Sequence, residues 1–253
     1  MLLADSVFAG VDPTATHKSF TYAALDRELN VVASGEADLD ELVDLLGGIS
    51  GATVAINAPS HLNSGLLRRS MEQKVAGAHQ LRGVDIRMAE HELRLRGIPV
   101  GGTAARESSC AAWVRIGLGL YGSLAVHGFE TYPSDCSHRM LETHPHAAFC
   151  ALLGRAPFAR PSPEGRMQRQ LALFERGVKL RDPMDYLEEI TRHKLLNGVL
   201  PVEVLLSPEQ LDALVAAYTA WIASEKAAEL SRLGEPEEGV IYLPVPELKE
   251  KYQ

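Results

Sequence analysis

Four oxygen-bearing side chains stand where predicted secondary-structure elements begin or end. Asp12 and Asn57 each close an apolar stretch, and Glu142 lies at the end of residues 140–143. Asp212 lies near the start of a long predicted helix. Carboxylate and amide oxygens suit Mg²⁺ or Mn²⁺, and crowded carboxylates repel one another unless protons or cations neutralise them. If one sheet gathers them at one side, these side chains predict a divalent-metal site that activates water to hydrolyse a phosphodiester. A turn former or an ion-paired carboxylate is the ordinary alternative for each acid.

The start of the chain predicts a strand that carries Asp12 to the edge of a sheet. An apolar run begins at Val7 and ends at Asp12, and the next residue, Pro13, cannot donate to a sheet ladder. Two more strand-like stretches, at residues 21–26 and 30–35, follow at the short spacing of hairpins. We therefore expect the chain to open as an antiparallel meander.

A helix and a buried strand are expected next. Acidic residues at 38–41 suit the positive end of a helix, and two glycines at 47–48 suit its end. Residues 52–58 form an apolar run that stops at Asn57, which is typical of a parallel strand buried on both faces. This order of elements predicts an α/β layer fold, to which residues 140–143 add a fifth strand.

The clearest predicted helix covers residues 207–228. Ser207 can cap it, Gln210 completes a capping box, and one side of the helix carries a stripe of small residues. Such a stripe would let the helix lie close to a sheet. Asp212 stands at the amino-terminal end of this stripe and is expected to point inward. A buried carboxylate is costly without a partner, so we expect Asp212 to have one.

The remaining segments are predicted to complete a single domain of residues 1–253. A helical insertion is expected at about residues 63–127, and it includes a long helix over about 104–127. A loop or hairpin arm is expected at 129–133, and a short strand from Val240. Further helices are expected at residues 147–154, 164–176 and 182–198.

Composition limits the class of protein. The chain has 253 residues and a net charge of −8, which argues against a general nucleic-acid coat protein, because such proteins carry clustered Lys and Arg. Three cysteines without metal-site spacing predict a reduced, cytoplasmic setting. No apolar run reaches the roughly 18 residues that a membrane helix needs, so we expect a soluble protein.

One segment departs from this acidic average. Between residues 155 and 181, seven Arg and Lys residues stand against two Glu. This excess of positive charge is compatible with a local anionic partner, nucleic acid or nucleotide, with Arg166 and Arg169 as phosphate clamps. A solvated, Arg-rich helix and loop is the ordinary alternative.

Seven stretches, taken in order, resemble one protein family: GVDPTATHKSFTYAALD, VAINAPSHL, AEHELRLRGIP, MLETHPHAAF, GRMQRQL, LDALVAAYTAW and GVIYLP. The family they resemble is the domain-of-unknown-function family 429 (DUF429), predicted nucleases of the ribonuclease H-like superfamily. The resemblance runs from Val7 to Pro244. It implies a mixed five-stranded sheet with the second strand antiparallel, helices on both faces, and metal-dependent phosphodiester hydrolysis. It also implies that Asp12 is the first-strand metal ligand, Glu142 the fifth-strand acid and Asp212 the acid on the last helix.

One departure from the family pattern follows the fourth strand. The family usually has Asp-Ala-Pro there, whereas this chain has Asn57-Ala58-Pro59. An amide oxygen can still ligate Mg²⁺, but it removes one negative charge and does not act as a base. Two hypotheses follow: a metal-dependent nuclease, or a module that kept the fold, lost the chemistry and binds nucleotide, nucleic acid or protein.

Two further interpretations concern other chemistry. His144 and His146 could bind a transition metal, although a turn-capping or exposed histidine is the more ordinary role. An actin-like or sugar-kinase ATPase shares the sheet order but needs a second such domain, for which the chain is too short.

Overall fold

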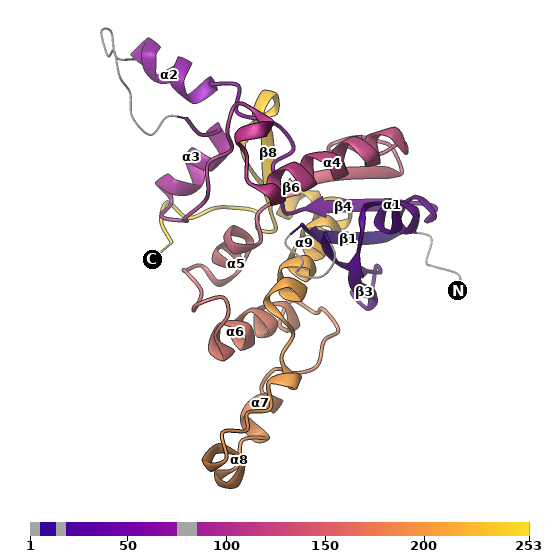
Figure 1. Ribbon diagram of the computed structural model, residues 1–253, viewed down its shortest axis with the longest axis vertical. Helices are drawn as coiled ribbons and strands as arrows, with labels where there is room; N and C mark the ends of the chain where they lie inside the picture. Colours follow the sequence, from indigo (N-terminus) through magenta and orange to yellow (C-terminus); the bar gives the residue numbers. More distant parts are fainter. Residues whose placement is uncertain (1–5, 14–18, 75–84, 253) are drawn as a thin grey trace.

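The computed structural model describes residues 6–13, 19–74 and 85–252. Within these residues the chain forms one mixed sheet of eight strands, ordered β3-β2-β1-β4-β6-β8-β7, with β5 beside β6 (Figure 1). The strands are β1 (Val7–Asp12), β2 (Phe20–Leu25), β3 (Val31–Ala37), β4 (Ala52–Ile56), β5 (Glu130–Thr131), β6 (His138–Thr143), β7 (Ser231–Glu235) and β8 (Gly239–Leu243). The α-helices are α1 (Leu39–Gly47), α2 (Leu66–Lys74), α3 (Met88–Leu95), α4 (Ala112–Val126), α5 (Pro145–Leu153), α6 (Pro163–Phe174), α7 (Asp185–Glu188), α8 (Arg192–Leu196) and α9 (Pro208–Glu225).

The first half of the sheet is arranged as the sequence predicts. β1 and β2 are antiparallel, β2 and β3 are antiparallel, and β4 lies parallel to β1. The helix between β3 and β4 begins with a capping box, in which Asp38 accepts from the backbone of Glu41 and Glu41 accepts from the backbone of Asp38. Every residue of β1 and β4 is buried, which agrees with the unbroken apolar character of these two stretches.

The expectation of five strands is wrong, because the described residues form eight. β5 is a two-residue strand parallel to β6, where the sequence predicts a loop or hairpin arm. β7 and β8 form an antiparallel hairpin at the edge of the sheet, and the sequence predicts β8 alone. β7 contains Arg232 and Gly234, and Gly234 has a φ of 91°. Residues 231–235 therefore lack the extended, apolar pattern by which a strand is recognised in a sequence.

Two predicted helices also differ from the structure. The helix predicted from about residue 104 begins only at Ala112, after a 3-10 turn at Glu107–Ser109. The helix predicted over residues 182–198 is divided into α7 and α8. The division occurs because the side chain of Thr191 accepts a hydrogen bond from the backbone of Lys194 (3.2 Å), which starts a new helix in the middle of the segment.

The two faces of the sheet are covered by different helices (Figure 1). Val11, Ile56 and Met140 pack in a core with residues of α1 and α4. Phe8 and Leu141, on the alternate positions of the same strands, pack in a second core with residues of α5 and α9. Within the described residues no helix is long and apolar enough to span a bilayer.

Helix α9 lies unusually close to β1 because both present small residues at the contact. A Cβ added at Gly10 would lie 2.0 Å from the carbonyl oxygen of Ala213 and 2.2 Å from the backbone nitrogen of Ala217. Gly10 therefore allows the two backbones to touch. The predicted close approach of this helix to the sheet is confirmed, and it places Asp212 near the end of β1.

Candidate active site

Asp12 and Asn57 lie side by side at the carboxyl ends of β1 and β4. Open α/β sheets bind ligands at this edge. Asp12 is fully buried, and Nδ2 of Asn57 donates a hydrogen bond to its Oδ1 (2.9 Å). Asn57 therefore supplies a hydrogen-bond donor to this buried carboxyl group.

Asp212 reaches the same place from α9, through the guanidinium group of Arg160. Oδ2 of Asp212 accepts a hydrogen bond from Nε of Arg160 (2.8 Å) and lies 2.7 Å from Nη2. The same Nη2 lies 3.8 Å from Oδ2 of Asp12. The Nη1 group donates to Oε1 of Glu209 (3.2 Å). The expectation that buried Asp212 has a partner is confirmed, and this partner also joins it to Asp12.

The electrostatics of the two carboxyl groups, those of Asp12 and Asp212, depend on their burial and on their closeness to each other. Burial, together with the nearby charge of Asp12, raises the pKa of Asp212 from 3.8 to about 7, although Arg160 acts in the opposite direction. The side chain of Arg160 is 40% exposed, whereas those of Asp12 and Asp212 are almost fully buried. The site therefore consists of two enclosed acids and one cation that is open to solvent.

Glu142 lies on the opposite face of the sheet from Asp12. It pairs in register with Ile56, which packs against α1 and α4, whereas Asp12 points toward Arg160 and α9. Glu142 is one position out of register with Asp12. Since successive side chains of a strand point to opposite faces of the sheet, the two carboxylates lie on opposite faces. The structure brings Asp12, Asn57 and Asp212 together and places Glu142 in a different network.

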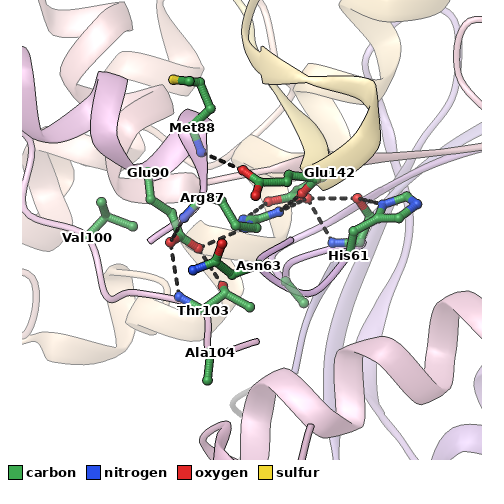
Figure 2. A network of polar contacts seen from close by, with 12 residues as sticks. His61, Asn63, Arg87, Met88, Glu90, Val100, Thr103, Ala104 and Glu142 are labelled. Carbon is green, nitrogen blue, oxygen red and sulfur yellow. Dashed lines mark hydrogen bonds and ion pairs between the residues drawn. The ribbon is translucent and has the colours of Figure 1, made fainter. Parts of the chain in front are cut away.

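That second network is built around Arg87 (Figure 2). Nη2 of Arg87 lies 2.6 Å from Oε1 of Glu142, and Nη1 donates to Oε2 (2.9 Å). Ser60 donates to the same Oε2 from its backbone nitrogen (2.8 Å) and its hydroxyl group (2.9 Å). Nε of Arg87 donates to Oε1 of Glu90 (2.9 Å), which also accepts from the hydroxyl group of Thr103. Glu142 thus joins Ser60 and Arg87 to β6, and Arg87 in turn holds Glu90.

A narrow cavity of about 30 Å³ lies at the sheet edge, between the two networks. Asn57 lines it from one network, and Arg87, Glu90 and Glu142 line it from the other; Trp113, near the start of α4, also contributes. This volume holds roughly two water molecules. The cavity is thus bordered by Asn57, the hydrogen-bond partner of Asp12, and by Glu142.

His144, which also lines this cavity, caps helix α5. Its Nδ1 accepts a hydrogen bond from the backbone nitrogen of Ala147 (3.2 Å), so this nitrogen carries no proton. Burial, together with the neighbouring His146, lowers the pKa of His144 to about 4. The turn-capping alternative is confirmed for His144.

The two predicted phosphate clamps have partners inside the protein. Nε of Arg166 donates to the carbonyl oxygen of Leu206 (2.8 Å), just before α9. Arg169 is buried, and its Nη1 donates to the carbonyl oxygens of Phe158 (3.0 Å) and Gly165 (2.9 Å). Both guanidinium groups therefore hold the chain around α6, and phosphate binding by them stays a prediction.

Arg160 and Arg87 are the site residues that sequence reasoning missed. For Arg160 the signal was the requirement that buried Asp212 have a partner, together with the excess of Arg and Lys in residues 155–181. Several arginines of that segment met the requirement equally well. For Arg87 the sequence held no comparable signal. Glu142 needs this partner because it lies on the other face of the sheet from Asp12, and that depends on the strand register.

Across residues 6–13, 19–74 and 85–252, no group of three or more His, Cys, Asp or Glu side chains is arranged to hold a metal ion. A metal in this site would depend on the two carboxylates of Asp12 and Asp212 together with other oxygen donors.

One comparison with known proteins gives a match. A family model described as "Protein of unknown function (DUF429)" matches residues 10–238, a range that contains both networks described above. Searches of the curated proteins and of the solved structures gave no match.

Proposed function

The chain belongs to the DUF429 family, and from that premise we propose that it is a divalent-metal-dependent phosphodiester hydrolase, a nuclease of ribonuclease H-like type. The observation that carries the proposal is the meeting of Asp12, on the first strand, with Asp212, on the last long helix. The strand order β3-β2-β1-β4-β6, with β2 antiparallel, supports the ribonuclease H-like part of it. Nucleic acid or nucleotide is the proposed partner.

The donor set suits a hard cation. Mg²⁺ is commonly bound in proteins through one or two carboxylates and keeps several water molecules and substrate oxygens as its other ligands. Asp12 and Asp212 supply two such carboxylates, and Asn57 supplies an amide. We assign Mg²⁺ or Mn²⁺ to Asp12 and Asp212, with Asn57 as an auxiliary ligand, and leave Glu142 out because Arg87 neutralises it. When bound, the ion would act as a Lewis acid at a phosphodiester and activate water.

Arg160 is the residue that would have to move when such an ion binds. Its guanidinium group now neutralises the same two carboxylates that would hold the metal. Since both cations would serve the same oxygens, metal binding would release Arg160 from Asp212. A released guanidinium group, already partly exposed, has the geometry to bind a phosphate through two parallel hydrogen bonds. Arg160 thus replaces Arg166 and Arg169 as our first choice of phosphate ligand.

The proposal is tested by calorimetric titration of Mn²⁺ and by cleavage assays on single- and double-stranded DNA and RNA. We expect the wild type to bind Mn²⁺ and to cleave in a metal-dependent way, and we expect Asp12→Asn and Asp212→Asn each to abolish both properties. Glu209→Gln is the matched control, because Glu209 also contacts Arg160 but lies outside the carboxylate pair. Cleavage that persists unchanged in both Asp variants would refute the nuclease proposal.

The contacts of Arg160 also favour a second candidate, a module that binds without hydrolysis. Its guanidinium group satisfies both carboxylates, and Asn57 stands where the family usually has an aspartate. In that case neither the wild type nor Arg160→Ala would bind Mn²⁺. Asn57→Asp then separates two cases, since gained metal binding and cleavage indicate a degenerate catalytic site, whereas no gain indicates a pure binding module.

A further inference from the structure

The segment between α6 and α9 exposes a large amount of apolar surface. Residues 182–203, here called the arm, include α7 and α8 and project from the rest of the protein (Figure 1). Exposure of 41 to 87% is found for six of its apolar side chains: Met184, Leu187, Leu195, Leu196, Val199 and Val202. Apolar side chains exposed singly are ordinary, but such a concentration in one segment marks an interaction site.

The arm contributes only Tyr186 and Ile190 to a small core that residues outside the arm complete. Tyr186, Val204 and Leu205 form a buried cluster, against which Met167 and Ile190 pack. This cluster is separate from the two cores of the sheet and includes Met167 of α6. It anchors the arm to the body of the protein and leaves the outer apolar side chains uncovered.

The charges of the arm are divided along its length. Residues 182–190 contain four acidic residues and no basic one, whereas residues 191–200 contain Arg192 and Lys194, with His193 between them, and no acidic residue; Glu203 at the end of the arm is a fifth acid. Two arms that lie side by side in opposite directions therefore place each acidic half against the basic half of the other. This charge pattern is complementary to itself, which is the requirement of a two-fold symmetric interface.

Glu188 and Arg192 are the charges best placed to act between two copies. In the part of the chain that the structure describes, neither residue forms an ion pair. Glu189, by contrast, pairs with Arg181 (2.7 Å) and Lys194 (3.7 Å). A symmetric interface brings residue i against residue j twice, so Glu188 and Arg192 can satisfy each other at two places.

We propose that the arm is the interface of a homodimer. The arms of two copies pack in opposite directions, their exposed apolar side chains meet at the centre, and Glu188 of each copy faces Arg192 of the other. This inference does not depend on the proposed nuclease activity, because the arm contains none of the residues of the Asp12 cluster.

The first test is the mass of the full chain in solution, measured by light scattering and sedimentation over a dilution series. We expect the wild type to have twice the chain mass of 27.5 kDa and Leu196→Glu to have the single chain mass, with unchanged circular dichroism. Leu95→Glu is the matched control, since Leu95 is 61% exposed on α3, outside the arm, and this variant should stay dimeric. A wild type that is monomeric at every concentration overturns the proposal, as does a dimeric Leu196→Glu.

The second test exchanges charges at low ionic strength, where exposed charges are least screened. Glu188→Arg alone and Arg192→Glu alone place like charges opposite one another, so both variants should dissociate. The double variant Glu188→Arg/Arg192→Glu should recover the dimer, and an equimolar mixture of the two single variants should form a heterodimer. Single variants as dimeric as the wild type, or folded single variants that fail to associate when mixed, overturn the antiparallel pairing.

Discussion

Asp12 and Asp212 are 200 positions apart in the chain, yet both lie against one atom, Nη2 of Arg160, at 3.8 and 2.7 Å. This relationship depends on how closely α9 approaches β1. Gly10 permits the approach, because any side chain there would meet the backbone of α9. The site is therefore held by a contact between backbones, two residues before Asp12 on the same strand.

Gly10→Ala should separate α9 from β1. The added Cβ would lie 2.0 Å from a backbone oxygen, which no side-chain rotation relieves. We expect the free energy of unfolding to fall by about 3 kcal/mol or more, as in severe overpacking of a core. Urea denaturation measures this loss. Gly119→Ala is the control, since a Cβ at this helical glycine would meet nothing within 4 Å; it should stabilise the protein by up to about 1 kcal/mol.

Arg160→Ala should leave two neighbouring carboxylates without their shared cation. We expect a loss of about 1–3 kcal/mol in the free energy of unfolding at pH 8, a range that is reduced for the partial exposure of Arg160. The loss should shrink at pH 5, where Asp212 can take up a proton. Arg155→Ala, at an exposed position in the same basic segment, should change stability by less than about 0.5 kcal/mol. Equal losses in the two variants would contradict the bridging role.

The raised pKa of Asp212 predicts a specific pH dependence. Between about pH 4 and pH 7 the folded protein keeps a proton on Asp212 that the unfolded chain releases, so stability must fall as the pH rises through this window. Each pKa unit corresponds to about 1.4 kcal/mol. The free energy of unfolding of the wild type, relative to Asp212→Asn, should therefore decline from pH 4 to pH 7 and level off above it. A constant difference over this range would show that the pKa is not raised.

Arg87→Met should be among the most destabilising single changes in the chain. It leaves Glu90 and Glu142 buried without their cation, and the removal of one partner of a buried ion pair typically costs about 3–5 kcal/mol. Glu142→Gln should cost less, because Arg87 keeps its bond to Glu90. Thermal and urea denaturation of both variants provide the measurement. Arg68→Ala, which breaks an exposed ion pair with Asp85, should cost at most about 1 kcal/mol; if it matched Arg87→Met, the argument from burial would fail.

Much of the fold is local information and could be predicted from the residues alone. The apolar runs of β1 and β4, the acidic first turn of α1 and the capping box that begins α9 are short-range patterns, and the structure places all four where the sequence predicts. The small residues of α9 predict its close approach to the sheet. The strand β7 could not be predicted in this way, because Arg232 and Gly234 interrupt the apolar pattern and the pairing with β8 alone makes the segment a strand.

The sequence by itself determined that Asp12 ends a buried strand and that Asp212 faces inward and needs a partner, because a buried carboxylate is costly when it is left alone. Only the tertiary structure decided that this partner is Arg160 rather than Arg166 or Arg169, since all three lie in one basic segment and differ only in what they reach through space. It also decided that Glu142 belongs to Arg87. A strand turns successive side chains to opposite faces, so a register difference of one residue, which no local pattern records, separates Glu142 from Asp12.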